Sequence, residues 1–278
     1  APQLEPAPTL PKRPPLLCPG CPHTGIYFVL SSLGQRARLP KAKDKAPKES
    51  NLTITGDIGC YTLGAYPPYF ALDTNACMGA SIGQAIGLTK AGLKKRVVAV
   101  IGDSTFLHSG ITGLVDAVYN QSRFTLLILD NGTTAMTGHQ EHPGTGVSAQ
   151  GKEMKAVVLE DLVRGIGVRN VRVVNAFDLK ELRSNVRSAL DNPELSVIIV
   201  RGACAVKVPK RGQPRAIDLE LCNACGACLL LGCPSIQSEG DKIFIDSSLC
   251  VGDACTLCQQ ICPRQAIMPL AKESKWRR

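Results

Sequence analysis

The 278-residue sequence has few aromatic side chains and no long apolar segment. It contains five tyrosines, six phenylalanines and one tryptophan, and no apolar run reaches the roughly 18 residues that a membrane-spanning helix needs. The amino-terminal stretch 1–17 is rich in proline and lacks the apolar region of a secretory signal. We therefore expect a cytoplasmic protein without a membrane span.

Cysteine, by contrast, is abundant and unevenly placed. Eight of the thirteen cysteines lie between residues 222 and 262, in two sets that each end in Cys-Pro. Similar stretches introduce the two sets, IDLELC at 217–222 and IDSSLC at 245–250. The pattern resembles the two-cluster bacterial ferredoxins, in which the fourth cysteine of each set binds the other set's 4Fe–4S cluster. Crossed ligation assigns one cluster to Cys222, Cys225, Cys228 and Cys262, and the other to Cys233, Cys250, Cys255 and Cys258.

The two sets depart from the usual ferredoxin spacing in two places. Four residues rather than three precede Cys233, and four rather than two separate Cys250 from Cys255. Both insertions keep every ligand, so we expect two clusters with altered loops. Disulfides are typical of short secreted chains, and zinc would explain one Cys-x-x-Cys pair but not two prolyl-flanked quartets.

The remaining cysteines are more scattered. Cys18 and Cys21 lie on a CPGC turn, whereas Cys60 and Cys204 follow apolar stretches that read as strands. These four residues could converge on a third cluster. Alternatively, Cys60, Cys77 and Cys204 are small buried apolar residues, as free cysteines often are.

Residues 18–206 alternate strand-like and helix-like stretches. This alternation predicts a mainly parallel sheet with helices on both faces, which is an α/β fold. The expected strands are 52–57, 97–103, 124–131, 171–176 and 196–202, and the expected helices include 109–119, 155–165 and 178–190. The predicted organisation is an extended arm (1–17), this α/β domain (18–206), a basic linker (207–216), a small α+β two-cluster ferredoxin-like domain (217–270) and a charged tail (271–278).

The stretch AVIGDSTFLHSGITG, residues 99–113, turns from a buried strand into a helix. Such turns bind phosphate, yet this one carries Asp103 and no lysine of a phosphate loop. Asn131 ends the next strand, so Asp103, Asn131 and a nearby backbone carbonyl would form an oxygen site suited to Mg²⁺. The expected ligand is a diphosphate bound as its magnesium complex, with the amides of Ser104 and Thr105 on the other phosphate. The alternative is an N-capping aspartate and a turn asparagine.

The pair GDS…DN is similar to the thiamine diphosphate (TPP) signature GDG…NN. It is accompanied by LCPGCPH, GDIGCYTLG, CMGASIGQAIG, AMTGHQEHPGTG and the ferredoxin-like module. Over residues 16–270 the chain therefore resembles the carboxyl-terminal part of the large subunit of 2-oxoacid:ferredoxin oxidoreductases, in particular of their indolepyruvate-oxidising members.

The resemblance implies roles for individual residues. Asp103, Asn131 and the backbone of Thr133 would hold Mg²⁺, and a third 4Fe–4S cluster would be bound by Cys18, Cys21, Cys60 and Cys204. The stretch expected to contact the thiazolium and diphosphate is Gly79, Ala80, Ser81 and Ile82, together with Gly102, Ser104 and Thr105. The substrate end would carry Thr137, His139 and Gln140, with His23 and His142 as further candidates for substrate or proton contacts. For each histidine the alternative is a structural role.

The activity that the resemblance implies is TPP-dependent oxidative decarboxylation of a 2-oxoacid to the acyl-CoA. Electrons would pass singly through the 4Fe–4S clusters to ferredoxin, in an anaerobic setting. The loop YTLGAYPPYF, residues 61–70, favours an arylpyruvate such as indolepyruvate. Pyruvate, phenylglyoxylate, or an electron-transfer subunit lacking bound TPP are the alternatives.

We find no pyrimidine-binding domain and no γ-type domain in the sequence. We therefore expect a fragment, or one subunit of a split enzyme that works as a hetero-oligomer and turns over poorly alone. The formal net charge is +9, which three thiolate-bound clusters would reduce to about +3. Because no aromatic residues are interleaved with the basic ones, we expect an acidic ferredoxin rather than nucleic acid as the partner of the basic segments.

Overall fold

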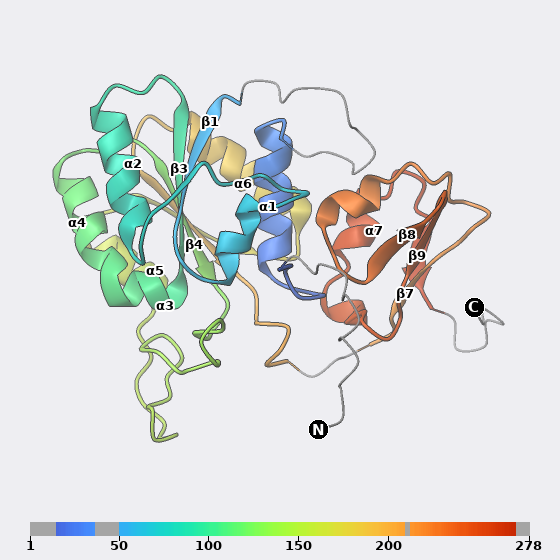
Figure 1. Ribbon diagram of the computed structural model, residues 1–278. Coiled ribbons are helices and arrows are strands. Elements are labelled where there is room, and N and C mark those ends of the chain that lie inside the picture. The colour runs from blue at the N-terminus through green and yellow to red at the C-terminus, as the bar shows by residue number, and fades with distance from the viewer. Residues whose placement is uncertain (1–14, 37–49, 209–211, 271–278) are drawn as a thin grey trace, which may run out of the picture.

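The computed structural model shows an α/β domain beside a smaller cysteine-rich module (Figure 1). It describes residues 15–36, 50–208 and 212–270. The predicted tail, residues 1–14 of the predicted arm and residues 209–211 of the predicted linker lie outside these ranges. Within them, no helix has both the length and the apolar character that crossing a bilayer requires.

Six parallel strands form the central sheet, in the order β2-β1-β3-β4-β6-β5. Their bounds are β1 Leu52–Gly56, β2 Thr74–Asn75, β3 Arg96–Gly102, β4 Thr125–Asp130, β5 Asn170–Asn175 and β6 Ser196–Arg201. All but the short edge strand β2 correspond to strands predicted from the sequence. The inner strands are apolar on both faces, because helices cover both sides of a parallel sheet.

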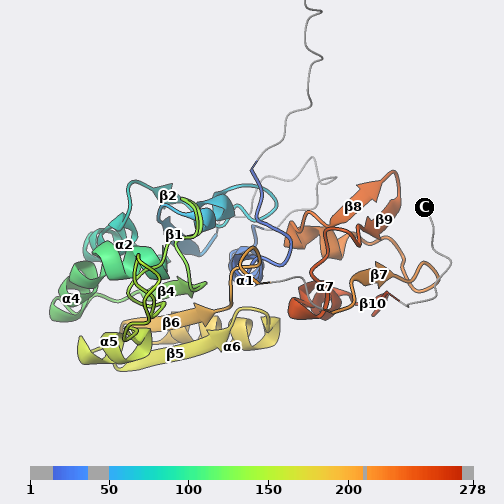
Figure 2. The same ribbon diagram turned by 90° about the horizontal axis from the view of Figure 1, so that it is seen from below.

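Helices pack on the two faces of the sheet, which confirms the predicted fold class. One face is covered by α1 (His23–Leu33) and α6 (Leu179–Asp191), and the other by α2 (Ala80–Lys90), α4 (Ile111–Tyr119) and α5 (Leu159–Gly165). The strand residues divide between these faces with the period of two that a pleated strand imposes. In β3, Val98 and Val100 pack toward α1, whereas Val97, Ala99 and Ile101 pack toward α2. Figures 1 and 2 show the helices flanking the sheet.

Three helical segments differ from the sequence-based expectation. Helix α1 was not predicted, because it is buried on nearly all sides and lacks the polar face that gives a helical period. Before α4, the chain forms the short helix α3 (Asp103–Thr105) and a π-helical turn, η2 (Phe106–Gly110). Helix α5 begins at Leu159 rather than near residue 155, since the preceding residues bond to the loop before them, as in Val157 N–H to the Pro143 carbonyl at 2.9 Å.

The cysteine-rich module is a small α+β unit. Strands β7 (Arg215–Ile217) and β10 (Ile267–Pro269) form one antiparallel pair, and β8 (Ile236–Glu239) and β9 (Lys242–Ile245) form the other. The helical parts are α7 (Leu257–Ile261) and the 3₁₀ turns η3 (Ala227–Leu231) and η4 (Gly252–Ala254). A further 3₁₀ turn, η1 (Cys60–Ala65), follows β1 in the α/β domain.

One continuous apolar core joins the module to the α/β domain. Leu231 and Leu257 of the module belong to the same buried cluster as α1 and α6, and α1 lies between the two parts (Figure 2). The Tyr69 hydroxyl donates to the Leu231 carbonyl, and the Gln260 side chain donates to the Phe177 carbonyl at 2.7 Å. The module therefore has a fixed position on the α1 side of the sheet.

Leu127 tests the core of the sheet, because it is fully buried in the central strand β4. We expect Leu127→Ala to lower the free energy of unfolding by about 2–5 kcal/mol, since the packed surroundings would leave a cavity. Val173→Ala on β5 is the control, as this side chain is 39% exposed, and should cost about 0.5 kcal/mol. Denaturant titration of both variants measures the difference, and equal losses would contradict the central position of Leu127.

Candidate functional site

A cavity opens at the carboxyl ends of β1, β3 and β4, with about 520 Å³ of space not filled by protein atoms. Its walls come from residues 58–61 after β1, residues 102–105 after β3, and the loop that begins at Asn131 after β4, together with His23. The strand order reverses between β1 and β3, and ligands of open parallel sheets bind at such reversal points.

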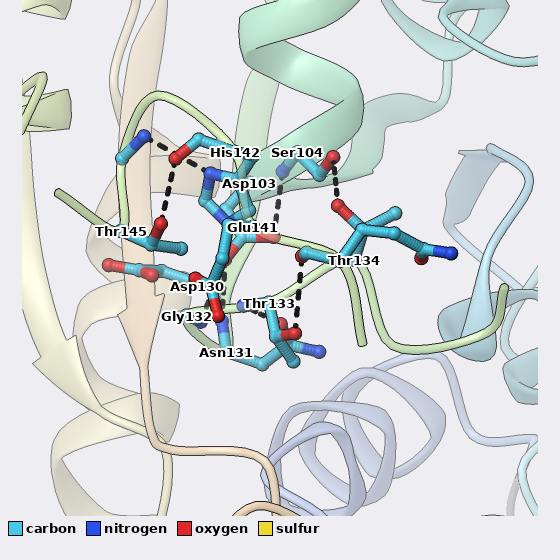
Figure 3. Close-up of polar contacts among 12 residues, drawn as sticks. Asp103, Ser104, Asp130, Asn131, Gly132, Thr133, Thr134, Glu141, His142 and Thr145 are labelled. Atoms are coloured by element: carbon cyan, nitrogen blue, oxygen red, sulfur yellow. Dashed lines mark hydrogen bonds and ion pairs between the residues drawn. The ribbon is translucent and has the colours of Figure 1, made fainter. Parts of the chain in front are cut away.

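Asp103 lies at the centre of this site and is buried (Figure 3). Its Oδ1 accepts the Ser104 N–H at 2.7 Å, and its Oδ2 accepts the N–H groups of Asn131 at 3.1 Å and Gly132 at 2.8 Å. Strands β3 and β4 are neighbours in register, with Gly102 opposite Leu129. The structure therefore brings Asp103 and Asn131 side by side, as the sequence predicts for neighbouring strands.

The oxygen atoms around Asp103 have the donor chemistry of a magnesium site. His142 faces the carboxylate, with Nε2 3.3 Å from Oδ2, while its Nδ1 accepts the Gly144 N–H at 3.2 Å. In the described ranges, no lysine or arginine forms an ion pair with Asp103. A buried carboxylate is costly without a cation, and Asp103, the Asn131 amide oxygen and the Thr133 carbonyl are the oxygen donors that Mg²⁺ prefers.

Asp57 is a buried carboxylate that the sequence reasoning missed. Its Oδ1 accepts the N–H groups of Ile58 at 2.7 Å and Gly79 at 2.9 Å, and its Oδ2 accepts the Ser81 N–H at 3.3 Å. Asp57 thereby ties the end of β1 to the start of α2. The four residues 79–82, which were predicted to contact the cofactor, do not line the cavity. Gly79 and Ser81 instead donate their N–H groups to Asp57, next to the cavity wall. The stretch GDIGC could have revealed Asp57, since it places an aspartate after a strand as GDS does.

Two glycines allow the backbone to pack closely around the cavity. A Cβ on Gly79 would lie 2.2 Å from the Ser109 Oγ, and the φ of Gly79 is +85°, a conformation that favours glycine. A Cβ on Gly102 would lie 2.4 Å from the Tyr61 ring. The Tyr61 hydroxyl donates to the Ile58 carbonyl at 2.9 Å, so the ring is held between the ends of β1 and β3.

His23 contributes a neutral imidazole to the cavity wall. Its ring meets the Tyr61 ring edge-on, with centroids 6.0 Å apart, and its Nε2 lies 3.5 Å from the Asn131 Nδ2. Burial lowers the pKa of His23 to about 4, although the Asp103 charge acts in the opposite direction. At neutral pH the imidazole can therefore accept a hydrogen bond at one nitrogen and donate at the other.

The residues predicted for the substrate end lie on the loop after β4, which projects from the sheet (Figure 1). Thr137 lines the cavity, whereas His139 and Gln140 do not. The Thr137 hydroxyl donates to the Gln140 Oε1 at 2.7 Å, and the Gln140 Nε2 donates to the Thr137 carbonyl at 2.8 Å. Residues 137–140 thus form a local turn, of which Thr137 alone lines the cavity.

The module contains two further cavities, each lined by one of the crossed cysteine quartets. The first cavity is lined by Cys222, Cys225, Cys228 and Cys262, and the second by Cys233, Cys250, Cys255 and Cys258. All thirteen thiols are free. No three His, Cys, Asp or Glu side chains of the described residues are grouped to hold a metal ion. In a four-iron cluster each thiolate binds a different iron. The sulfur atoms therefore lie farther apart than the ligands of a single metal ion.

The remaining quartet consists of Cys18, Cys21, Cys60 and Cys204. It lies between the cavity of Asp103 and the cysteine-rich module. Cys60 lines the cavity of Asp103, and the Cys204 N–H donates to the Asn131 carbonyl at 3.1 Å. Burial, followed by the nearby thiols of Cys18 and Cys204, raises the pKa of Cys60. Cys21 is buried and interacts with the same three thiols.

Gly20 extends this grouping toward the module. It lies between Cys18 and Cys21 on the CPGC turn and lines the cavity of the Cys233 quartet. Burial raises the pKa of Cys233, and a hydrogen bond from the Gly20 backbone N–H lowers it. Cys77, in contrast, is exposed and lines none of these cavities.

Residues 57–200 match the family described as thiamine pyrophosphate enzyme, C-terminal TPP binding domain. The chain belongs to this family. The matched residues begin directly after β1 and end in β6. Apart from His23, every residue that lines the cavity of Asp103 falls inside the match.

Named relatives extend the similarity of this TPP-binding chain into the cysteine-rich module. The indolepyruvate oxidoreductase subunit IorA of Methanothermobacter marburgensis is 45% identical over 268 residues, which cover 96% of this chain and 42% of the relative. The IorA of Archaeoglobus fulgidus is 42% identical over 265 residues, covering 93% of this chain and 40% of the relative. The chain thus spans about two fifths of the length of these relatives.

A solved structure shares the fold of this TPP-binding chain. It is a 2-oxoglutarate:ferredoxin oxidoreductase from Magnetococcus marinus with 2-oxoglutarate, coenzyme A and succinyl-CoA bound. The TM-score is 0.58 at 17% sequence identity, and the alignment covers 70% of this chain and 66% of the other.

Asp57 allows a test of the link between β1 and α2. We expect Asp57→Asn to lower the free energy of unfolding by about 1–3 kcal/mol, because the amide presents an NH₂ group to a backbone donor. Asp178→Asn is the matched control: Asp178 accepts the Glu181 N–H at the start of α6, where asparagine caps about as well as aspartate. Denaturant titration compares the two variants, and an unchanged stability of Asp57→Asn would refute the proposed link.

Proposed function

We propose that this chain is the TPP-binding and electron-transferring part of a 2-oxoacid:ferredoxin oxidoreductase that acts on an arylpyruvate such as indolepyruvate. The observation that carries the proposal is the position of the Cys18–Cys21–Cys60–Cys204 quartet. It borders the cavity of Asp103 on one side and, through Gly20, the cavity of a second cysteine quartet on the other. An enzyme that oxidises a bound intermediate one electron at a time needs this adjacency.

In the proposal, Asp103, Asn131 and the Thr133 carbonyl hold Mg²⁺, which binds the diphosphate of TPP. The amides of Ser104 and Thr105 begin a helical segment and favour the remaining phosphate charge. When bound, TPP supplies the electron sink for decarboxylation of a 2-oxoacid. Asp57 and Gly79 do not contact the cofactor in this proposal; the hydrogen bond between them fixes the start of α2.

His23 and the loop after β4 have separate roles at the substrate end. His23 stays neutral and can hydrogen-bond to substrate without adding a charge to the site. Thr137 is the loop residue that lines the cavity, and the Thr137–Gln140 bonds fix the turn that carries His139. His142 contacts the same Asp103 oxygen, Oδ2, that accepts the Asn131 N–H.

The proposed electron route follows the three quartets. Cys18, Cys21, Cys60 and Cys204 would hold a 4Fe–4S cluster beside the cavity, where it would supply one-electron redox chemistry. Cys233, Cys250, Cys255 and Cys258 would hold the next one, because Gly20 connects the two sites. Cys222, Cys225, Cys228 and Cys262 would hold the one from which an external ferredoxin is reduced.

Partner chains complete the proposed enzyme. Because this chain spans about two fifths of its relatives, we assign the pyrimidine-binding and γ-type domains to other parts of a hetero-oligomer. Coenzyme A receives the acyl group. The choice of indolepyruvate rests on the names of the relatives, since Tyr61 is the one residue of the loop 61–70 that lines the cavity. Assays with indolepyruvate, pyruvate and phenylglyoxylate distinguish the substrates.

Asp103→Asn tests the cofactor site. We expect the variant to bind TPP at saturating Mg²⁺ about 100-fold more weakly, because the site loses its carboxylate ligand. Asp116→Asn on α4 is the control, since that carboxylate lies on the exposed side and bonds to the Asn120 side chain. Calorimetric titration of the complex measures both, and equal affinity of Asp103→Asn and the wild type would reject the Mg²⁺ assignment.

Metal analysis tests the three quartets. The complex purified without oxygen should contain about twelve irons and one TPP per copy of this chain. Cys204→Ser should lose about four irons, whereas Cys77→Ser should keep all of them, because Cys77 lies in no quartet. Eight irons with TPP in the wild type would remove the third cluster and keep the enzyme. Eight irons without TPP or Mg²⁺ would leave an electron-transfer protein.

A further inference from the structure

Arg215 is a buried cation beside one of the cysteine quartets. It begins β7, its side chain is 5% exposed, and it lines the cavity of Cys233, Cys250, Cys255 and Cys258. Its Nη2 donates to the Asp253 Oδ1 and its Nε to the Gln259 Oε1, both at 2.7 Å. Its backbone N–H points to the Cys250 Sγ at 3.3 Å. Both the charge and the N–H group of Arg215 therefore act on this quartet.

The unusual spacing between Cys250 and Cys255 produces this arrangement. The four intervening residues, where two are usual, form the turn η4 and supply Asp253. The Asp253 Oδ2 also accepts the Gln213 N–H at 3.0 Å, and the Gly252 N–H points to the Cys250 Sγ at 3.4 Å. The insertion thus holds the chain before β7 against the quartet and fixes the Arg215 guanidinium there.

The positive charge is only partly balanced by its partner. The Asp253 side chain is 57% exposed, whereas that of Arg215 is 5% exposed, so water screens the carboxylate more than the guanidinium. Toward the quartet, the net electrostatic effect is that of a cation.

The other quartet of the module also has two N–H groups directed at sulfur, from Ala224 to the Cys222 Sγ at 3.4 Å and from Ala266 to the Cys262 Sγ at 3.3 Å, but among the described residues its cavity is lined by no buried arginine. The arginine that lines its cavity is Arg264, which is exposed and whose Nε donates to the Leu221 carbonyl at 3.4 Å. Its charge is largely screened by solvent. The two cavities therefore differ in the burial of their arginine.

We propose that Arg215, held by the Asp253 turn, raises the reduction potential of the cluster at the Cys233 quartet above that of the cluster at the Cys222 quartet. This inference rests on the proposed function, because it requires clusters at both quartets. Reduction adds one electron to a four-iron cluster, delivered by the cluster nearer the cofactor cavity. N–H groups directed at sulfur would stabilise the added negative charge at both quartets, whereas the buried cation would stabilise it at the Cys233 quartet alone. Arg215 keeps its proton throughout, so no proton accompanies the electron.

The test is a redox titration of the complete complex, purified without oxygen and followed by electron paramagnetic resonance. The signal of the Cys233 quartet is the one lost in Cys258→Ser. We expect Arg215→Gln to shift its midpoint potential to a more negative value, and Arg215→Lys to restore most of the shift. Arg264→Gln is the matched control and should shift the other cluster by a smaller amount. Asp253→Asn removes the carboxylate that partly balances Arg215, while its amide oxygen can still accept from the guanidinium, so this variant should shift the potential in the opposite direction to Arg215→Gln and covers the case in which Arg215→Gln does not fold.

Iron analysis precedes the titration and separates two kinds of failure. A wild-type complex without iron at the module would overturn the proposed function and this inference with it. Wild-type iron content with an unchanged potential in Arg215→Gln and Asp253→Asn would overturn the role of Arg215 alone. A shift in Arg264→Gln as large as that in Arg215→Gln would also overturn it, since burial would then not distinguish the two arginines.

Discussion

The site depends on hydrogen bonds from backbone N–H groups to two buried carboxylates. Asp57 binds the start of α2 to the end of β1, and Asp103 binds the loop after β4 to the end of β3. Each carboxylate lies directly after a parallel strand, so the sheet sets their positions. These bonds attach the three loops around the cavity to the ends of the strands.

The second constraint is helix α1, which connects the cavity to the cysteine-rich module. The CPGC turn before it carries Cys18 and Cys21, its first residue His23 lines the cavity, and its apolar residues share a core with the module. A module of this size has little core of its own. Packing on α1 therefore supplies part of its stability and at the same time fixes the distance between the quartets and the cavity.

The sequence allowed the strands, the parallel sheet and the pairing of Asp103 with Asn131 to be predicted, because β-branched runs and residues at strand ends carry local signals. The grouping of the module's cysteines into crossed quartets was predicted from the resemblance of their spacing to that of two-cluster ferredoxins. Helix α1 was missed because burial on all sides removes its period. Asp57 and Arg215 were missed for another reason: their partners, Gly79, Ser81 and Asp253, are far away in the sequence and become neighbours only through tertiary packing.

Gly20 sets how closely two of the quartets approach. Its φ of +72° and the Val251 side chain, which lies 2.3 Å from where a Cβ would be, leave no room for any other residue. Electron tunnelling between two centres slows exponentially as the medium between them thickens. A methyl group at this position would push the CPGC turn away from the module and widen the gap. In the proposed electron route, a residue with no side chain, no charge and no redox chemistry would therefore limit the rate of electron transfer between two centres.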